Sequence, residues 1–168
     1  MRREELLQLL FREVRIVDDA ARISLLKALP PRLSEQQFAV LSHLRFTTNR
    51  DETPGDLARL FGVSRPAMTQ LLARLVRRQL VMLQSSERDG RSRHVTLTNA
   101  GRAAQGAVLE TLGTELAAIA RKLRKPELEA LLTDLKQFRI AVESALPRTA
   151  PHPDPAPDAD RASAESAR

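Results

Sequence analysis

The sequence predicts a mainly α-helical fold with one small β-hairpin, and two observations carry this prediction. Apolar residues recur at spacings of three and four along most of the chain, which is the period of amphipathic helices. Only the segments 80–83 and 95–97 look like short strands, and the polar stretch between them contains Asp89-Gly90, a strong hairpin signal. With 168 residues, the chain is long enough for one core domain with small appendages.

The charge of the chain favours an anionic partner. Its formal net charge is +6 and its pI is about 10.8, which indicates nucleic acid before a membrane surface. Arginine greatly outnumbers lysine, which suits recognition of phosphate and guanine but follows equally from a GC-rich genome. The charge is concentrated in residues 53–101, where eight arginines and three acidic residues give +5.

The composition also argues against several chemistries. Without cysteine the chain has no disulfide, thiolate switch or cysteine zinc site, and its three histidines are too scattered for a metal site. No glycine-rich phosphate loop or nucleophile elbow occurs, so we expect neither a cofactor nor enzyme activity. Without an apolar run of about 18 residues or a signal-peptide pattern, the protein is expected to be cytoplasmic and to have no membrane contact.

Long helices are expected on either side of the charged segment. The first spans about 2–29 and ends at Pro30, with an apolar seam at spacings of three and four. Thr98 can cap a helix over about 99–123, and a last helix runs from Pro126 to about residue 146. An apolar seam on helices outside a compact unit needs a partner surface, and a second copy of the chain is the economical candidate.

These boundaries divide the chain into a folded part and a tail. We expect residues 1–146 to form one domain, with a central unit at about 33–98 and flanking dimerisation helices at about 2–29 and 99–146. Residues 147–168 are rich in proline and alanine and contain no large apolar side chain. Because they cannot bury enough surface to offset the entropy of ordering, they are expected to form a disordered tail.

Capping patterns mark three short helices in the central unit. Ser34 begins a capping box in which the hydroxyl and a glutamine three residues later satisfy backbone amides reciprocally. Thr53 begins the next helix, which ends near Gly62, the expected left-handed residue of a tight turn. Ser64 is the natural N-cap of the helix that follows, with Pro66 in its first turn.

The helix that begins after Ser64 has two different faces. With residues about 100° apart around the helix axis, its core side holds Met68, Leu71, Leu72, Leu75 and Val76. The candidate recognition face consists of Ser64, Arg65, Pro66, Thr69, Gln70, Arg74 and Arg77. In a DNA major groove, Arg65, Thr69 and Gln70 would reach base edges, while the other two arginines and the helix N-terminus would contact phosphates. Taken alone, the pattern also fits an amphipathic helix with a solvated arginine face.

The hairpin favours DNA binding over that alternative. Its turn region holds four candidate wing residues, Arg88, Asp89, Arg91 and Arg93. Narrow minor grooves attract inserted arginine side chains, and Asp89 could orient the Arg91 guanidinium by a charge-assisted hydrogen bond. A recognition helix beside a basic hairpin is the arrangement of a winged helix-turn-helix, so we expect double-stranded DNA as the partner.

Three segments, in order, resemble the MarR family of multiple-antibiotic-resistance-type transcriptional regulators. They are LSEQQFAVLSHL in the second helix, LARLFGVSRPAMTQLLARL in the helix-turn-helix, and DGRSRHVTLTNAG in the wing. The resemblance spans about residues 6–146. It implies a homodimer held by the first and last two helices, a pseudo-palindromic operator with one recognition helix per half-site and, most often, repression. It also implies that Asp89 and Arg91 are the wing pair.

Two positions depart from the family pattern. Gln79 stands where a helix-ending glycine is usual, and Leu83-Gln84 replaces the common basic pair on the first wing strand. The second departure weakens the expectation of phosphate contacts from that strand, for which Arg88 or Arg93 could substitute.

The resemblance also implies an effector. Regulators of this type often respond to small aromatic or phenolic ligands held between the dimer body and the winged unit, here between the first, second and fifth helices. Candidate lining residues are Phe38, His43 and Phe46. Their helical spacing fits equally two core phenylalanines and a histidine with a partner inside the protein. His94 is expected on the outward face of the wing with Thr96, and to be solvated.

Two other functions remain open. The same fold could serve as a protein-interaction module, which would favour hydrophobic residues at positions such as Arg65 and Gln70, where the chain has polar ones. A sequence-neutral architectural DNA binder would show a steep salt dependence with little preference between sequences.

Overall fold

The protein is mainly α-helical with one two-stranded antiparallel hairpin, as the sequence predicts. The computed structural model describes residues 1–47, 52–85 and 93–146. The proposed tail at 147–168 lies outside these ranges. The elements in chain order are α1 (Arg3–Ala28), α2 (Glu35–Phe46), α3 (Pro54–Phe61), α4 (Arg65–Arg77), β1 (Val81–Ser85), β2 (Arg93–Leu97), α5 (Asn99–Thr111), α6 (Gly113–Ala120) and α7 (Lys125–Ala145).

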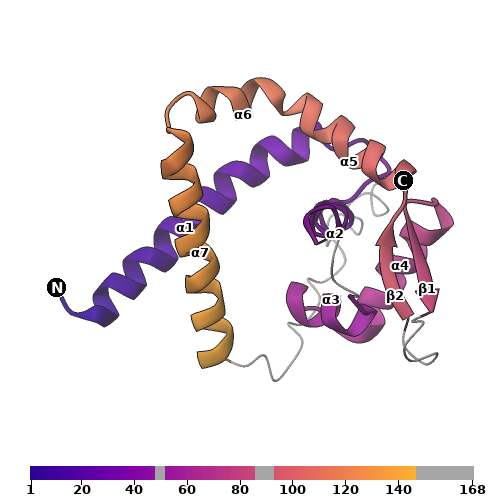
Figure 1. The fold of residues 1–168 in the computed structure, drawn as a ribbon, viewed down its shortest axis with the longest axis horizontal. Helices are drawn as coiled ribbons and strands as arrows, with labels where there is room; N and C mark the ends of the chain where they lie inside the picture. The colour runs from indigo at the N-terminus through magenta and orange to yellow at the C-terminus, as the bar shows by residue number, and fades with distance from the viewer. Residues whose placement is uncertain (48–51, 86–92, 147–168) are drawn as a thin grey trace, which may run out of the picture.

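These elements form two parts that are joined by α5 (Figure 1). The winged unit consists of α2, α3, α4, β1 and β2, and the helical arm consists of α1, α6 and α7. In the arm, α7 crosses α1, and the rings of Phe11 and Phe138 pack 5.4 Å apart at this crossing. Helix α5 contacts both α1 and α2, so it fixes the arm to the winged unit.

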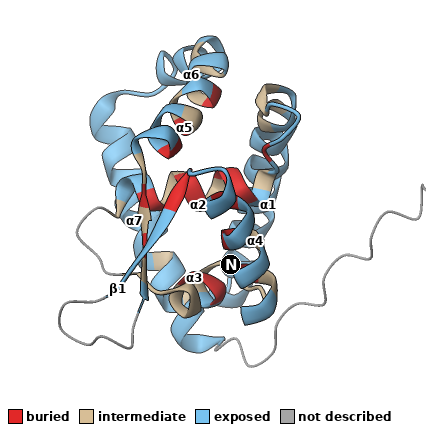
Figure 2. Ribbon diagram, turned by 90° about the vertical axis from the view of Figure 1, so that its right-hand side faces the viewer, coloured by how far each residue is buried: buried red, intermediate tan, exposed pale blue. Residues whose placement is uncertain are grey.

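The hydrophobic core lies in the winged unit and on the adjoining face of α5 (Figure 2). Its fully enclosed side chains include Leu41 of α2, Leu57 of α3, Leu75 of α4, Val81 of β1 and Val108 of α5. Helices α1, α6 and α7 contain no buried residue. A single copy of the chain therefore builds a packed core in the winged unit but leaves its arm without one.

The predicted helix starts are confirmed, since each depends on residues close together in sequence. The Ser34 hydroxyl accepts the Gln37 amide at 3.2 Å, and the Gln37 side chain accepts the Ser34 amide at 3.1 Å. Thr53 caps α3 and Ser64 caps α4 through their side chains. Gly62 adopts φ 65°, the left-handed conformation expected between the two helices.

Three boundaries differ from the prediction. The helix expected over 99–123 is divided into α5 and α6 at Leu112, beside Gly113, a residue that lowers helix propensity. The first strand begins at Val81 rather than at residue 80, and the returning strand begins earlier, at Arg93. Val76, expected in the core, is 36% exposed because it lies at the edge of the buried face of α4.

Gln79 ends α4 in a conformation that favours glycine. Its φ is 57°, and its amide donates to the Val76 carbonyl at 2.8 Å while the Leu80 amide donates to Leu75 at 3.0 Å. These bonds close the helix in the manner of a left-handed C-terminal motif. Glycine is usual at this position in the family that the sequence resembles, and here glutamine adopts the same backbone geometry.

We expect Gln79→Gly to raise the free energy of unfolding by about 0.5–1 kcal/mol, because glycine adopts positive φ without a Cβ clash. Urea denaturation measures this change. Gln84→Gly, in the extended strand β1, is the matched control and should lower stability instead. A loss of stability in Gln79→Gly would show that the glutamine side chain contributes more than its backbone strain costs.

Thr98 and Gly101 join the wing to α5. The Thr98 hydroxyl lies 2.6 Å from the Gln79 carbonyl oxygen and accepts the Gly101 amide at 2.9 Å. The Thr98 amide donates to the Leu80 carbonyl at 3.2 Å. A Cβ added at Gly101 would lie 2.0 Å from that same Leu80 oxygen. The segment Leu97-Thr98-x-x-Gly101 thus lies at a close crossing of two backbones.

Candidate nucleic-acid interface

Helix α4 is held by one face and presents the other to solvent. Met68, Leu72 and Leu75 are at most 2% exposed and pack in the core. Ser64 is half-buried at the N-cap, where its hydroxyl accepts the Ala67 amide at 3.2 Å. The remaining predicted recognition residues are all exposed, and these are Arg65, Pro66, Thr69, Gln70, Arg74 and Arg77. The structure therefore brings the whole predicted face together on one accessible helix surface.

Two features suit this surface to DNA. Among the described residues, no carboxylate forms an ion pair with Arg65, Arg74 or Arg77. The Thr69 hydroxyl donates to the Arg65 carbonyl at 2.8 Å, so it is used within the helix and its methyl group remains for an external contact. Unpaired guanidinium groups suit phosphate and guanine, and a methyl group suits the thymine C5-methyl.

The wing is described only at its base. Strands β1 and β2 pair in antiparallel register from Val81↔Leu97 to Ser85↔Arg93, and Arg93 is exposed where β2 begins. The other predicted wing residues, Arg88, Asp89 and Arg91, lie outside the described residues.

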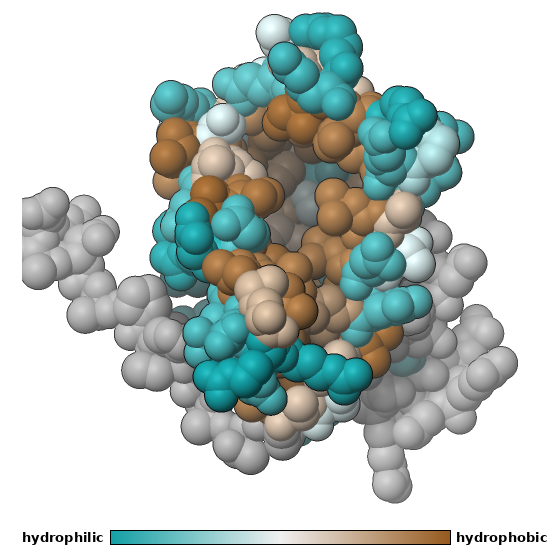
Figure 3. Space-filling model, turned by 90° about the vertical axis from the view of Figure 1, so that its left-hand side faces the viewer, coloured by the Kyte–Doolittle hydropathy of each residue, from teal (hydrophilic) through white to brown (hydrophobic). Residues whose placement is uncertain are grey.

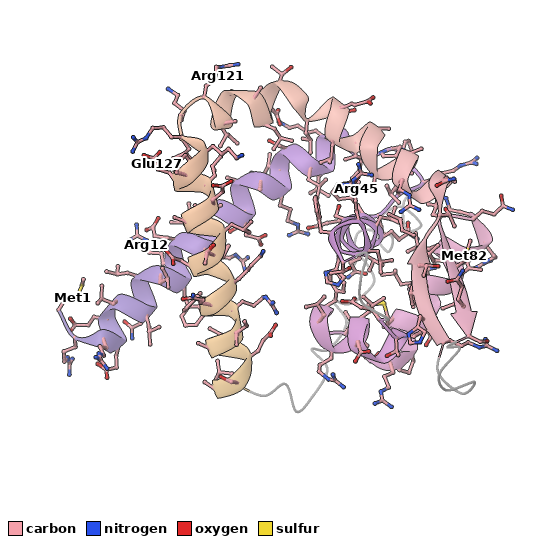
Figure 4. The ribbon with its side chains drawn as sticks, in the orientation of Figure 1. Met1, Arg12, Arg45, Met82, Arg121 and Glu127 are labelled. Atoms are coloured by element: carbon pink, nitrogen blue, oxygen red, sulfur yellow. The ribbon has the colours of Figure 1, made fainter. Side chains whose placement is uncertain are left out.

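The outer side of β1 is apolar rather than basic. Met82 is 44% exposed and Leu83 is 39% exposed. Met82 lies on the hairpin, far from Arg12 on α1 and from the turn between α6 and α7 (Figure 4). A groove of about 450 Å³ between β1 and α4 is lined by Leu83, Thr69 and Val76, among others. No basic side chain on β1 is available for phosphate contact, which agrees with the departure noted in the sequence.

The expectation that His94 is solvated is wrong. The residue is half-buried, and both of its ring nitrogens are enclosed without a hydrogen-bond partner. Strand β2 pairs with β1 on one side, and on the other the Val95 amide donates to the Glu52 carbonyl at 2.8 Å. Strand β2 therefore has a hydrogen-bond partner on each side.

The three candidate effector residues do not surround one cavity. Phe38 is 7% exposed and belongs to the core, whereas Phe46 is 79% exposed at the end of α2. His43, but neither phenylalanine, lines a cleft of about 860 Å³ that lies between α2, α3 and α7 rather than between the first, second and fifth helices. Helical spacing alone could not separate these three environments, because they depend on which other elements pack against α2.

The cleft is lined by an aromatic pair and by charged groups of both signs. The rings of His43 and Phe61 meet edge to face with centroids 5.8 Å apart. Helix α7 contributes Lys136, Arg139 and Glu143 to the opposite wall. The Arg139 guanidinium lies 2.8 Å from the Glu143 carboxylate, whereas Lys136 forms no ion pair with a described residue.

Two acidic side chains of the cleft have partners of their own. The Glu52 carboxylate lies 2.6 Å from His43 Nε2, so this histidine has a partner inside the protein. The Thr53 hydroxyl donates to the Asp56 carboxylate at 2.7 Å, and this bond holds the pKa of Asp56 below its usual value. Sequence reasoning missed Glu52, because nothing local connects it to His43.

The helical arm exposes an extensive apolar surface, which gathers around a hollow on one face of the molecule (Figure 3). On α1 the exposed large side chains are Leu6, Leu7, Leu9, Leu10, Phe11, Val14, Ile16, Val17, Ile23 and Leu26. On α7 they are Leu128, Leu131, Leu132, Leu135 and Ile140. Surfaces of this kind on a folded protein mark a site of interaction.

Two further features are absent from the described residues. None of the helices is both long and apolar enough to cross a bilayer. Nowhere in the described ranges do three or more histidine, cysteine, aspartate or glutamate residues cluster as metal ligands would.

Known proteins are similar to this chain in both sequence and fold. Residues 33–92 match the model of the MarR family. The transcriptional activatory protein BadR of Rhodopseudomonas palustris is 46% identical over 71 residues, which cover 42% of this chain and 41% of BadR. The crystal structure of apo MarR from E. coli shares 27% sequence identity with a TM-score of 0.57, over 77% of this chain and 95% of that chain.

A third similar protein shows the fold alone. A mutant of S. aureus MepR, solved with a bound oligodeoxyribonucleotide, shares 18% sequence identity with a TM-score of 0.51, over 84% of this chain and 99% of that chain.

The winged unit, its exposed basic helix and the helical arm define a winged helix-turn-helix protein. The match of residues 33–92 to the family model, the likeness to BadR over 71 residues and the agreement with E. coli MarR along nearly all of that chain support a MarR-family winged-helix regulator. These similarities indicate a regulator rather than an enzyme.

Proposed function

We propose that this protein is a homodimeric regulator that binds a pseudo-palindromic operator in double-stranded DNA. The observation that carries the proposal is the exposed face of α4, where Arg65, Arg74 and Arg77 have no ion-pair partner among the described residues. Arg65, Thr69 and Gln70 read base edges, and the later arginines contact phosphates. A mutant of MepR, which shares only the fold, has been solved with an oligodeoxyribonucleotide.

The helical arm supports the dimer. Helices α1 and α7 present long rows of apolar side chains that the described part of a single copy leaves exposed. Two copies related by a two-fold axis would bury these rows against each other. The proposed division is therefore a winged unit at about 33–98 between dimerisation segments at about 2–29 and 99–146. One recognition helix per copy predicts half-sites about one helical turn apart.

Repression is the proposed direction of regulation, as the family resemblance implies. BadR, similar over part of its length, is named an activatory protein. A reporter gene placed behind a bound operator in cells with and without the protein decides between the two. Repression requires lower expression with the protein present, and higher expression would establish an activator.

Substitutions on α4 test the assignment of the recognition face. Gln70→Ala is expected to relax base preference by about 1–3 kcal/mol at one position of each half-site. Arg74→Ala should weaken binding to all sequences about equally and reduce the salt dependence, because its contact is to phosphate. Competition between operator variants measures both changes. A uniform loss of affinity in Gln70→Ala would contradict the assignment.

We further propose that a small aromatic ligand releases the protein from DNA by binding the cleft of about 860 Å³. Phe61 and the edge of His43 offer an aromatic surface, and Lys136 offers a cation for an acidic substituent. Benzoate and phenol are suitable first probes, since they differ in charge. Calorimetry with each probe and a Lys136→Met control distinguishes binding in the cleft from binding elsewhere.

The two other functions make different predictions. An architectural binder would retain all DNA sequences about equally, with a steep dependence on salt. A protein-interaction module would retain no DNA although it is folded and dimeric.

A further inference from the structure

Glu52 connects three elements of the winged unit. Its carboxylate lies 2.6 Å from the Nε2 atom of His43 on α2. Its backbone carbonyl accepts the Val95 amide of β2 at 2.8 Å. The residue that follows, Thr53, is the N-cap of α3. One residue thus joins the first helix of the winged unit, the start of the helix-turn-helix and the returning strand of the wing.

The contact between Glu52 and His43 is shielded from water. The Glu52 side chain is 13% exposed and the His43 side chain is 24% exposed. The imidazole is also held by the edge-to-face contact with Phe61, and the carbonyl of His43 accepts the Thr47 hydroxyl at 2.8 Å. A partly buried carboxylate that loses its partner must move or remain uncompensated. Removing the imidazole therefore leaves the Glu52 carboxylate without this partner, in the same residue whose backbone carbonyl accepts the Val95 amide.

The backbone at Glu52 in turn contacts the DNA side of the molecule through β2. Arg93 lies two residues before Val95 on the same strand and is exposed. Glu52 makes both the side-chain contact with His43 and the backbone bond to Val95. A shift of Glu52 would therefore move the strand that carries Arg93. Helix α4 has anchors of its own in the core, Met68, Leu72 and Leu75.

We propose that Glu52 is a positioning residue for DNA binding, and that its pair with His43 holds β2 in place relative to α4. This inference rests on the proposed DNA-binding function. Neither residue touches DNA. The pair sets the orientation of the wing strand, and the base preference of α4 is independent of it.

Four variants of the full chain test this role. Glu52→Ala and His43→Ala should each weaken affinity for an operator selected with the wild-type protein by about 2- to 30-fold. Because both substitutions remove the same contact, the double variant should bind the operator about as tightly as the weaker-binding single variant. Glu52→Gln retains a hydrogen bond to the imidazole and should bind within about twofold of wild type. Base preference should stay unchanged in all of them.

Glu143→Gln is the matched control. It neutralises a carboxylate on the α7 wall of the same cleft, where Glu143 pairs with Arg139 and has no bond to the wing. Its operator affinity should equal that of wild type. An affinity loss as large as that of Glu52→Ala would show that charge in the cleft, rather than the position of β2, governs binding.

Hydrogen exchange at the Val95 amide separates positioning from general destabilisation. In Glu52→Ala and His43→Ala, exchange should become faster over β2 while the amides of α4 and α5 keep their protection. Faster exchange throughout the winged unit would contradict the proposal, as would additive losses of affinity or wild-type binding by both single variants. If the wild-type protein itself does not bind DNA, the proposed function is overturned together with the positioning role. If the wild-type protein binds DNA but the variants behave as just described, only the positioning role is overturned.

Discussion

Replacing Gly101 with alanine is expected to lower the free energy of unfolding by about 3 kcal/mol or more, because it forces a methyl group into a packed backbone crossing. The new Cβ would lie 2.0 Å from the Leu80 carbonyl oxygen and 2.7 Å from Leu97 Cδ1. The Leu80 oxygen cannot move away freely, since it accepts the Thr98 amide. Urea or thermal denaturation of the purified variant measures the loss.

Gly106→Ala is the matched control for this substitution. Gly106 lies on the same helix, and a Cβ placed there meets no atom within 4 Å. Alanine should therefore raise stability by about 0.5–1 kcal/mol through its better helix propensity. Equal stability of the two variants would show that α5 does not approach the Leu80 backbone as closely as the structure has it.

The second large effect is expected at the proposed dimer surface. Leu131 of α7 is 59% exposed in the single chain and lies in the apolar row that two copies would bury together. Leu131→Glu should convert the dimer to a monomer, because it places an uncompensated carboxylate in an apolar contact from each copy. Operator affinity should fall by about 100-fold or more, since a monomer engages only one half-site. Sedimentation and operator titration measure the two effects.

Ala130→Glu tests whether the position of the charge matters. Ala130 adjoins Leu131 in sequence, is exposed and lies on the polar side of α7. Ala130→Glu should leave both the dimer and the operator affinity unchanged. A monomer in both variants, or a dimer in both, would contradict the proposed interface.

The helix starts, the turn glycine and the exposed face of α4 could be predicted because each depends on neighbouring residues. Ser34 and Thr53 form capping boxes with residues three positions away. Gly62 is the only glycine with positive φ among the described residues, and it lies where the turn pattern requires it. The faces of α4 follow from helical periodicity alone.

Other features could not be predicted because they depend on contacts distant in sequence. Gln79 shows no local preference for a positive φ, and its conformation is fixed by the packing of Leu80 and by Thr98. The enclosure of both His94 ring nitrogens has no signal in the neighbouring sequence. The cleft depends on the placement of α7 opposite α3, which no periodicity encodes.

Sequencing the genomic DNA that the purified protein retains at near-physiological salt tests the central claim most directly. The expected result is enrichment of a few sites that share an inverted repeat, with half-site centres about one helical turn apart. Uniform retention of all fragments, or retention of none by a folded dimer, would contradict the claim that this protein is a dimeric, sequence-specific DNA-binding regulator.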